Sequence, residues 1–281
     1  MAKNNKLLIK YVRAKFFILS RISKKKAAKE AFDLFCTPIP NEIPNHPALP
    51  SSNEVLQFRL NGLLVKGYRW NKGGKERLLI LHGFSSSASN FYHLVSEFIK
   101  NDFEVLAFDA PAHGSSEGKN INVIVYAEMI KKILDLYGPV QNYVAHSFGG
   151  LAVCIALEEI SHPKTTRVVL LAPATETTSA IDGAFKLLRI NNPTVRKEFD
   201  NLILKLSGRP AEWYSIKRAI KNIKAKVLWI HDEGDNITPI IDAKNALIES
   251  PENVKFLVTT GLGHRKIYKD KDVVNTVISF L

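Results

Sequence analysis

Short apolar runs alternate along most of the chain with longer stretches of helical periodicity. The runs are aliphatic or β-branched and nearly continuous in apolar character, which is typical of strands buried on both faces of a sheet. They are Arg77–Leu81, Glu104–Phe108, Asn142–Ala145, Arg167–Leu171, Val227–His231 and Lys255–Val258. The helical stretches lie near residues 90–100, 121–137, 148–160, 239–249 and 270–281. The alternation predicts an α/β protein with a doubly wound, mostly parallel sheet.

An antiparallel hairpin is predicted before these elements. Val55–Leu60 and Leu63–Trp70 are both rich in apolar residues and are separated by Asn61-Gly62. Asn-Gly between two such runs is the strongest short-range hairpin signal, because both positions of the tight turn need a positive φ. The sheet is therefore expected to have eight strands.

One connection in the sheet is too long for a plain crossover. About 50 residues separate Ala172 from Val227, whereas a crossover needs far fewer. Apolar residues recur within it at helical spacing: Phe199, Leu202, Ile203 and Leu206, followed by Ile216, Ile220 and Ile223. We expect a helical cap at 175–224, inserted into a core formed by 51–174 and 225–281.

The N-terminal 50 residues are predicted to be an appendage to this core. The first 35 indicate a helix, since apolar residues follow helical spacing and basic residues fill the rest of the wheel. This stripe consists of Leu8, Val12, Phe16, Leu19 and Ile22. Five prolines between Pro38 and Pro50 then predict a linker or extended strap.

Composition places the chain among ordinary globular proteins. It has 281 residues, 46% hydrophobic and 23% charged, which excludes disordered, collagen-like and disulfide-scaffold classes. Two cysteines form no disulfide framework. The longest N-terminal stretch without a polar residue, Phe16–Leu19, is far short of a membrane span or a secretory core. We expect a reducing, cytoplasmic compartment.

The positive charge is concentrated in two segments. Of the net charge of +12, residues 1–30 carry +9 and residues 175–224 carry +5, which leaves the remainder close to neutral. Nucleic-acid binding is not expected, because the folded body has no basic stripe interleaved with aromatic residues. Residues 1–30 either pack on the body or contact an anionic membrane peripherally. The strap that leads directly into the fold favours packing.

A serine occupies one of the strand-to-helix junctions. The sequence Ala145-His146-Ser147-Phe148-Gly149-Gly150 surrounds Ser147 with small residues, which permits a tight turn that exposes the hydroxyl group. A helix that begins at Phe148 would direct its free N–H groups toward whatever Ser147 attacks. A serine before two glycines is also a common helix cap.

A second junction supplies donors for an oxyanion. His82-Gly83-Phe84-Ser85 follows the strand Arg77–Leu81, and Gly83 allows the backbone to bend toward the serine turn. The amides of Phe84 and Phe148 are then expected to form an oxyanion hole. Taken alone, the segment is somewhat more typical of an ordinary loop.

The last two junctions supply an acid and a base. Asp232, Glu233 and Asp235 follow one strand, but their spacing fits no Ca²⁺ loop and no second cluster completes a metal shell. His264 follows Gly263 on a flexible loop after the final strand. The residues Ser147, Asp235 and His264 therefore predict a nucleophile, an orienting acid and a base at one edge of the sheet.

In these motifs the sequence resembles the α/β-hydrolase superfamily over residues 55–281, and more narrowly the bacterial esterase-like hydrolases with a short helical cap. The matching segments are His82–Phe84, Asp109–Ser116, the Ser147 turn, His231–Pro239 and Gly263-His264. The chain departs from the family where Ala145 and Ala112 replace usual glycines and where Asp232 follows His231.

The resemblance implies the roles of the neighbouring residues. Asp235 is the expected acid, with Asp232 and Glu176 as alternatives. His113 is the alternative base, although in the family the loop that carries it shapes the site. Asp109 is expected to be structural for the same reason. His82, Gly83, His146 and Gly149 are expected to support the site.

The resemblance also implies a serine hydrolase that needs no cofactor or metal. A serine nucleophile argues against dehalogenase and epoxide hydrolase chemistry. Because the family's cap lies over the active site, the apolar and basic residues of 175–224 suggest an ester or thioester with an apolar acyl part and an anionic group. The lysines are at least as compatible with side chains that simply face solvent. The alternatives are a carbon–carbon bond hydrolase, a peroxidase-like activity, and a catalytically silent binding protein.

Overall fold

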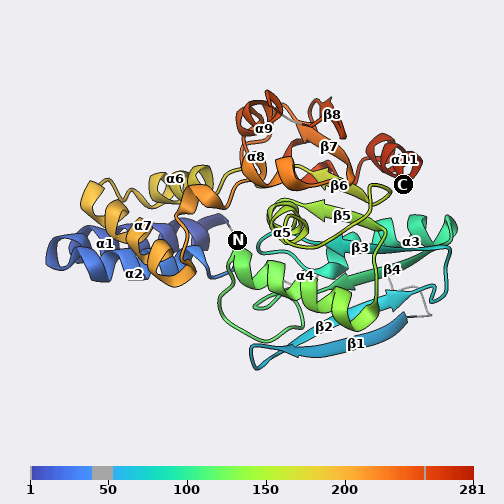
Figure 1. Ribbon diagram of the computed structural model, residues 1–281. Coiled ribbons are helices and arrows are strands. Elements are labelled where there is room, and N and C mark those ends of the chain that lie inside the picture. The colour runs from blue at the N-terminus through green and yellow to red at the C-terminus, as the bar shows by residue number, and fades with distance from the viewer. Residues whose placement is uncertain (1, 40–52, 250) are drawn as a thin grey trace. The chain divides into compact units, whose positions relative to one another are not determined.

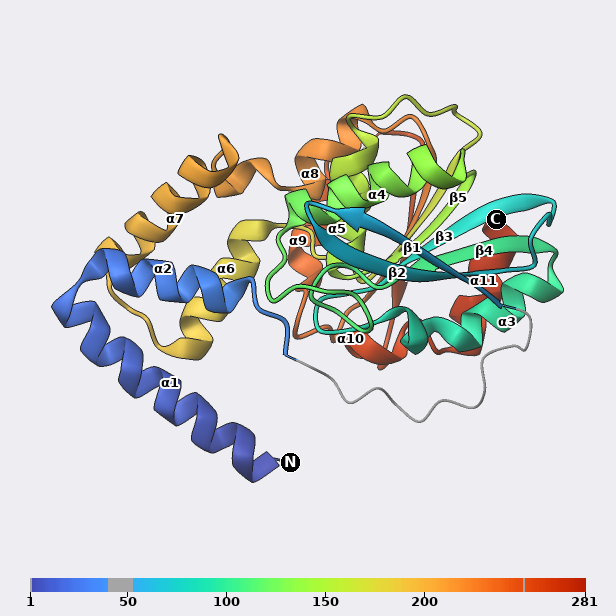
Figure 2. The ribbon, with the colours of Figure 1, turned by 90° about the horizontal axis from the view of Figure 1, so that it is seen from below.

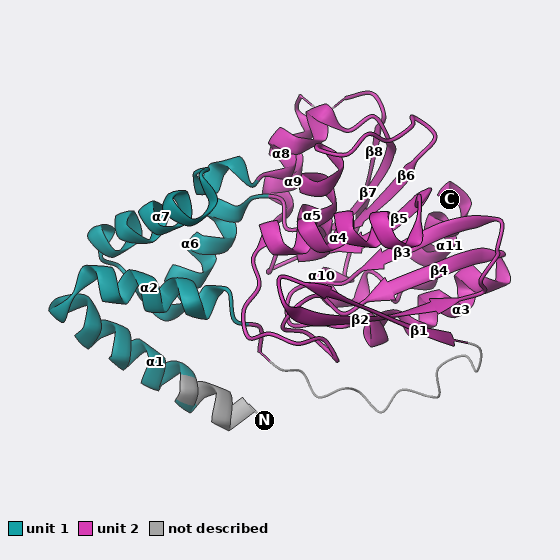
Figure 3. Ribbon diagram, turned by 60° about the horizontal axis from the view of Figure 1, so that its bottom comes forward, with its two compact units in different colours: residues 1–37, 176–214 teal, residues 38–175, 215–281 magenta. Residues whose placement is uncertain are grey.

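The computed structural model describes residues 2–39, 53–249 and 251–281, and these residues form two compact units. Residues 1–37 and 176–214 make a helical unit, and residues 38–175 and 215–281 make an α/β unit (Figure 3). Pro40, Pro44, Pro47 and Pro50 of the predicted strap lie outside the described residues. The assignment of 175–224 as a cap over the core stays a prediction.

The α/β unit is built on one eight-stranded sheet (Figure 1). The strands are β1 Asn53–Leu60, β2 Leu63–Trp70, β3 Glu76–Leu81, β4 Phe103–Phe108, β5 Asn142–His146, β6 Arg167–Leu171, β7 Lys226–Asp232 and β8 Val254–Thr259. Their spatial order is β1-β2-β4-β3-β5-β6-β7-β8. The pairs β1–β2 and β2–β4 are antiparallel and the others are parallel. The predicted fold class is confirmed.

The initial hairpin closes where the sequence indicated. Leu60 pairs with Leu63, and the turn residues Asn61 and Gly62 have φ values of 50° and 84°. These positive angles are what a two-residue turn between twisted antiparallel strands requires.

Helices cover both faces of the sheet (Figure 2). They are α3 Tyr92–Lys100, α4 Val123–Tyr137, α5 Phe148–Leu157, α8 Ile216–Ala219, α9 Ile240–Leu247, α10 Gly263–Lys266 and α11 Lys271–Phe280, with short 3₁₀ turns at Ala88–Phe91 and Ile220–Asn222. Helices α3 and α11 lie on one face, and α4, α5 and α9 on the other. Beneath α3 and α11, side chains such as Phe98, Ile80 and Val277 form a buried core.

The helical unit contains α1 Ala2–Ile22, α2 Lys24–Phe35, α6 Thr177–Leu188, α7 Pro193–Ser207 and a 3₁₀ turn at Ala211–Trp213. The N-terminal helices therefore pack against helices of the long insertion, an arrangement not anticipated from the sequence. The single helix expected over the first 35 residues is divided at Ser23, whose extended backbone ends α1 and whose side chain caps α2 by accepting from Lys26 N–H.

An aromatic cluster holds the helical unit together. Phe199 of α7 is fully buried, and its ring lies 5.7 Å from Phe32, 5.9 Å from Phe35 and 5.2 Å from Phe185. Edge-to-face packing of this kind favours a fixed arrangement of α2, α6 and α7.

Among the predicted stripe residues whose side chains the structure describes, two are exposed. Leu206 of α7 is 62% exposed and Ile22 of α1 is 73% exposed, because each lies at the end of its helix beyond the packed turns. Ile216, Ile220 and Ile223 are buried, but they belong to the α/β unit.

The structure also shows where the two cysteines lie. Cys36 and Cys154 are buried as free thiols, and burial raises the pKa of the Cys36 thiol to about 12.

Within the described part of the chain, no helix combines the length and apolar character that crossing a bilayer requires.

Candidate active site

Ser147 lies on a strained turn between β5 and α5. Its backbone has φ 53° and ψ −119°, a conformation that a non-glycine residue adopts only when its surroundings impose it. Ser147 N–H donates to the carbonyl of Leu171 at 3.1 Å, and Ser147 C=O accepts from the amides of Gly150 and Ala174, each at 2.9 Å. These bonds hold the hydroxyl group at the carboxyl end of the parallel strands.

Three glycines let neighbouring backbone approach this turn. A Cβ atom on Gly149 would lie 2.6 Å from the carbonyl oxygen of Leu81, and one on Gly83 would lie 2.9 Å from Cβ of Ser147. A Cβ on Gly150 would meet Pro173 at 2.6 Å. Helix α5 and the loop after β3 can therefore pack this closely against the serine only because these residues lack side chains.

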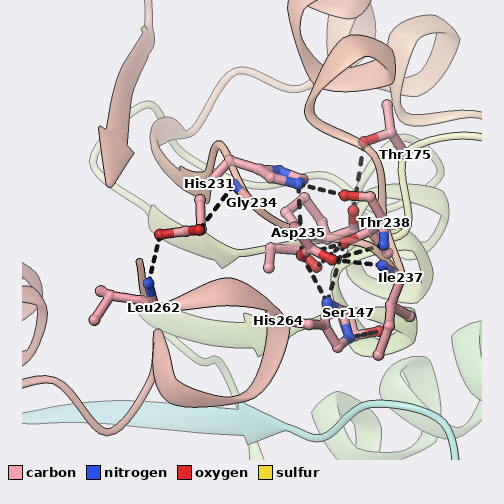
Figure 4. A network of polar contacts seen from close by, with 12 residues as sticks. Ser147, Thr175, His231, Gly234, Asp235, Ile237, Thr238, Leu262 and His264 are labelled. Carbon is pink, nitrogen blue, oxygen red and sulfur yellow. Dashed lines mark hydrogen bonds and ion pairs between the residues drawn. The ribbon is translucent and has the colours of Figure 1, made fainter. Parts of the chain in front are cut away.

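His264 connects the serine to a carboxylate (Figure 4). Its Nε2 lies 3.0 Å from Oγ of Ser147, and its Nδ1 lies 2.8 Å from Oδ2 of Asp235. The three residues are separated by 29 to 117 positions in sequence and come from the ends of β5, β7 and β8. In this geometry, Nδ1–H donates to the carboxylate and Nε2 is free to accept the serine proton.

Asp235 is a buried acceptor in a cage of donors. Its Oδ1 accepts from the amides of Ile237 and Thr238 at 2.8 and 2.9 Å, and its Oδ2 accepts from the Thr238 hydroxyl at 2.8 Å. Burial favours the neutral acid, but the hydrogen bonds from His264 and these donors outweigh it and lower the pKa of Asp235 to about 2. Asp235 is therefore ionised near neutral pH.

Thr238 is a site residue that the sequence analysis did not identify. Besides its bonds to Asp235, its Oγ1 lies 3.1 Å from Nδ1 of His264. The local signal that could have identified it is the spacing Asp-x-x-Thr. In such a turn the aspartate carboxylate accepts hydrogen bonds from the residues two and three positions further along the chain, here Ile237 and Thr238.

Asp232, the alternative acid, has a different set of partners. It accepts from the Gly234 amide at 2.9 Å, the Thr259 hydroxyl at 2.9 Å and the Leu262 amide at 3.0 Å. Burial opposes ionisation, yet these bonds lower its pKa below the ordinary value. Asp232 thus joins the loop after β7 to the start of α10, the short helix that carries His264 where the sequence predicted a loop. The other alternative, Glu176, immediately precedes α6 in the helical unit.

The two predicted oxyanion donors lie on neighbouring segments, one at the start of α5 and one in the loop after β3. Phe148 occupies the first position of α5, where a helix leaves backbone N–H groups without intrahelical acceptors. Phe84 follows Gly83, and its ring contacts that of Phe148 edge to face with centroids 5.7 Å apart. Their roles as oxyanion donors stay predictions.

Two buried histidines shape the loop that carries Phe84. Nε2 of His113 accepts from the Ser85 amide at 3.0 Å while its Nδ1 bonds to the carbonyl of Pro111 at 3.0 Å. Nε2 of His82 accepts from the Ala110 amide at 3.0 Å. Burial lowers the pKa of His113 to about 3 and that of His82 to about 4. Since both ring nitrogens of His113 are occupied, its contacts are those of a structural residue.

Asp109 and His231, which also lie near the site, form hydrogen bonds with the backbone. The carboxylate of Asp109 accepts from the amides of Ala88 and Ser115, each at 2.8 Å. His231 bonds through Nε2 to the carbonyl of Thr238 at 2.7 Å, behind Asp235. Among the residues in the three described ranges, no three His, Cys, Asp or Glu side chains are grouped to hold a metal ion.

Part of the chain matches a known family. A model of the family described as alpha/beta hydrolase fold matches residues 76–210. The chain is 25% identical over 113 residues to putative esterase/lipase 2 of Mycoplasma pneumoniae, covering 38% of this chain and 41% of that protein. The match thus spans about two fifths of that relative's length.

Two further comparisons extend over more of the chain. It is 25% identical over 244 residues to 2-hydroxy-6-oxononadienedioate/2-hydroxy-6-oxononatrienedioate hydrolase of Paraburkholderia phymatum, covering 70% of this chain and 83% of that protein. The solved structure of the esterase Pf2001 of Pyrococcus furiosus superposes with a TM-score of 0.66 at 19% identity, covering 88% of this chain and 96% of that one. At this identity, the structural likeness shows a shared fold.

Proposed function

We propose that this chain, which belongs to the α/β-hydrolase superfamily, hydrolyses a carboxylic ester or thioester through an acyl-serine intermediate. The observation that carries the proposal is the bridging position of His264, 3.0 Å from Ser147 Oγ and 2.8 Å from Asp235 Oδ2. Ser147 acts as nucleophile, His264 as base and Asp235 as the acid that orients His264.

Acylation begins with proton transfer from Ser147. As Oγ attacks the carbonyl carbon of the substrate, Nε2 of His264 accepts the hydroxyl proton, and the ionised Asp235 stabilises the imidazolium that forms. The tetrahedral intermediate then collapses, the bond to the leaving oxygen or sulfur breaks, and His264 returns the proton to that atom. The acyl group remains on Ser147.

Deacylation repeats these steps with water. His264 accepts a proton from water, and the hydroxide equivalent attacks the acyl carbon. Collapse of the second intermediate breaks the bond to Oγ and releases a carboxylic acid, while His264 returns the proton to Oγ of Ser147. In both intermediates, the amides of Phe84 and Phe148 donate to the oxyanion. Losing one such donor typically costs about 10²- to 10³-fold in rate.

The substrate we favour has an apolar acyl part and an anionic group. Residues 175–224, the predicted cap, combine large apolar side chains such as Trp213 and Tyr214 with ten Lys and Arg residues against five acids. Esters that differ only in a terminal carboxylate test this. Equal kcat/KM values for the neutral and anionic members would remove the anionic group from the proposal.

A carbon–carbon bond hydrolase is the second candidate. It is favoured by the similarity over 70% of the chain to a hydrolase that is named for a 6-oxo dienedioate. The same nucleophile and base would serve, and the substrate would again carry carboxylates. Turnover of such a dienedioate at a kcat/KM above that of every ester tested would favour this candidate.

Steady-state hydrolysis of p-nitrophenyl esters and acyl-thioesters by the full chain tests the main proposal. We expect activity that falls by roughly 10⁴-fold or more in Ser147→Ala. Ser279→Ala, which removes an exposed hydroxyl on α11, serves as the matched control and should retain full activity. Equal activity in Ser147→Ala and the unaltered chain would refute the proposal.

A further inference from the structure

Helix α1 exposes a row of large apolar side chains. Leu7, Tyr11, Ile18 and Ile22 are 65%, 68%, 57% and 73% exposed. Their spacings of four, seven and four residues place them on one face of the helix. Phe17, 62% exposed, lies beside this row.

The row is additional to the face by which α1 packs in the helical unit. Phe16 is only 2% exposed, and the side chain of Arg13 donates to the carbonyl of Leu187 at the end of α6, at 2.8 and 3.0 Å. Folding of the helical unit therefore uses one side of α1 and leaves the apolar row on another side. Contiguous exposed apolar surface of this kind marks an interaction site.

Basic side chains lie along one side of the row and beyond its end. Lys10 and Arg21 are exposed, three residues after Leu7 and Ile18 respectively, and so flank the row on one side. Lys25 and Lys26 are exposed just beyond the end of α1. The guanidinium of Arg21 lies 3.4 Å from the centroid of the Phe17 ring, which leaves its charge at the edge of the apolar surface.

The acids of the N-terminal helices do not offset this charge at the row. The sequence has two acids in residues 1–37, and both are ion-paired: Glu30 with Lys15 and Asp33 with Lys29, each at 2.5 Å. The helical unit as a whole has sixteen Lys and Arg residues and seven acids, a net charge of +9, whereas the α/β unit has a net charge of +3.

We propose that the exposed face of α1 binds an anionic lipid surface. Leu7, Tyr11, Ile18 and Ile22 would enter the boundary between headgroups and acyl chains, and the lysines and Arg21 would contact lipid phosphates. A bilayer that contains anionic lipid matches both parts of this surface. Its acyl chains match the apolar row, and its negative headgroups match the basic residues beside the row. A second copy of this chain would instead bring two units of charge +9 together.

Sedimentation of the full chain with vesicles tests the proposal. We compare vesicles of phosphatidylcholine alone with vesicles that also contain about one third phosphatidylglycerol, at about 0.05 M and about 0.5 M salt. We expect the protein to sediment with the anionic vesicles at low salt, and much less with phosphatidylcholine alone or at high salt.

Two sets of variants separate the apolar and the basic contributions. Ile18→Ser/Ile22→Ser should weaken binding by roughly tenfold or more, since each change removes a large apolar side chain from the interface. The matched control is Ile241→Ser/Ile248→Ser, which alters side chains 56% and 78% exposed in the α/β unit and should bind normally. Lys10→Gln/Lys25→Gln/Lys26→Gln should weaken binding to anionic vesicles by about fivefold per lysine.

Three results would overturn the proposal. These are no sedimentation with anionic vesicles, binding by Ile18→Ser/Ile22→Ser equal to that of the control variant, or a dimer in sedimentation velocity that this variant dissociates. Thermal unfolding of each variant checks that its fold is retained. Because the readout requires no catalysis, it is independent of the proposed hydrolase activity.

Discussion

His146 donates a hydrogen bond from Nε2 to the main-chain carbonyl of His264 at 2.9 Å, and the two imidazole rings lie 4.7 Å apart. The residue before the proposed nucleophile is therefore attached to the residue proposed as base. Tyr268 packs against His146 with centroids 4.7 Å apart, and Phe91 stacks on Tyr268 at 4.8 Å. This buried group holds the His264 loop against the serine turn.

The charge state of His146 suits this position. Burial and, after it, the nearby His264 lower the pKa of His146 to about 3, so it is neutral at pH 7. A protonated His146 would repel the imidazolium that forms on His264 during the proposed reaction. Neutral His146 therefore positions His264 without disfavouring its protonation.

Replacement of His146 tests this positioning role. His146→Phe keeps a ring but removes the donor to His264, so we expect kcat to fall by about fivefold to tenfold with KM unchanged, as for loss of one hydrogen bond. His146→Gln, whose amide nitrogen can replace Nε2 as donor, should recover most of kcat. Steady-state kinetics of both variants supply the measurement. A rise in KM alone, or no recovery in His146→Gln, would contradict the role.

Neutralising the two buried acids at the end of β7 and just beyond it, Asp232 and Asp235, should have different consequences. Asp235→Asn should reduce kcat by roughly 10³- to 10⁴-fold, because an amide no longer holds Nδ1–H of His264 in the required tautomer. Asp232→Asn should chiefly destabilise the fold, since that carboxylate accepts from Gly234, Thr259 and Leu262. Activity and urea unfolding of both variants distinguish the two roles. The assignment is wrong if Asp232→Asn loses more kcat than Asp235→Asn.

Adding one methyl group beside the serine should impair catalysis. In Gly83→Ala the new Cβ would lie 2.9 Å from Cβ of Ser147 and 3.0 Å from Nδ1 of His146, so the loop bearing Phe84 must shift. We expect kcat to fall by about 10²-fold, as when an oxyanion donor is displaced. Gly183→Ala in α6 is the control, because its Cβ meets nothing within 4 Å. Equal rates for the two variants would show that the close approach is unimportant.

Buried neutral histidines make the stability of the fold depend on pH. Burial lowers the pKa of His82 to about 4 and of His113 and His146 to about 3, whereas an unfolded histidine titrates near 6.5. Below about pH 6.5 the unfolded chain thus binds more protons than the native one, and the free energy of unfolding falls as pH decreases. Each histidine contributes up to about 1.4 kcal/mol per pH unit.

Asp235 adds a second decrease in the free energy of unfolding, at lower pH. Its native pKa of about 2 is below the ordinary value of 3.8, so its stabilising contribution is complete above about pH 4 and is lost as pH falls toward 2.

Urea unfolding between about pH 8 and pH 5 measures the effect of the buried histidines separately from that of Asp235. A free energy of unfolding that stays constant over this range would exclude it.

Two features could be predicted from the sequence, the sheet and the proximity of the site residues, because both follow from local patterns. Continuous apolar runs gave the strands, and Asn61-Gly62 gave the hairpin turn. Because parallel strands end at one edge, the residues after β5, β7 and β8 had to lie near one another. The structure brings Ser147, Asp235 and His264 together there.

Other features were not accessible because they depend on contacts between distant segments. Periodicity indicates that α1, α2 and α7 are helices, but nothing in it shows that Phe32 and Phe35 would pack on Phe199. Leu206 follows the helical stripe of α7 yet is exposed, since a periodic pattern does not show where packing ends. The contacts of Thr238 with Asp235 and His264 depend on a turn whose conformation only the folded loop defines.

Covalent labelling with a fluorophosphonate measures the reactivity of Ser147 most directly, because the probe modifies only an activated serine. Intact mass spectrometry and peptide mapping of the native full chain should show a single adduct on Ser147, absent in Ser147→Ala and strongly reduced in His264→Ala. Labelling that persists in Ser147→Ala, or a native protein that remains unlabelled, would contradict the account.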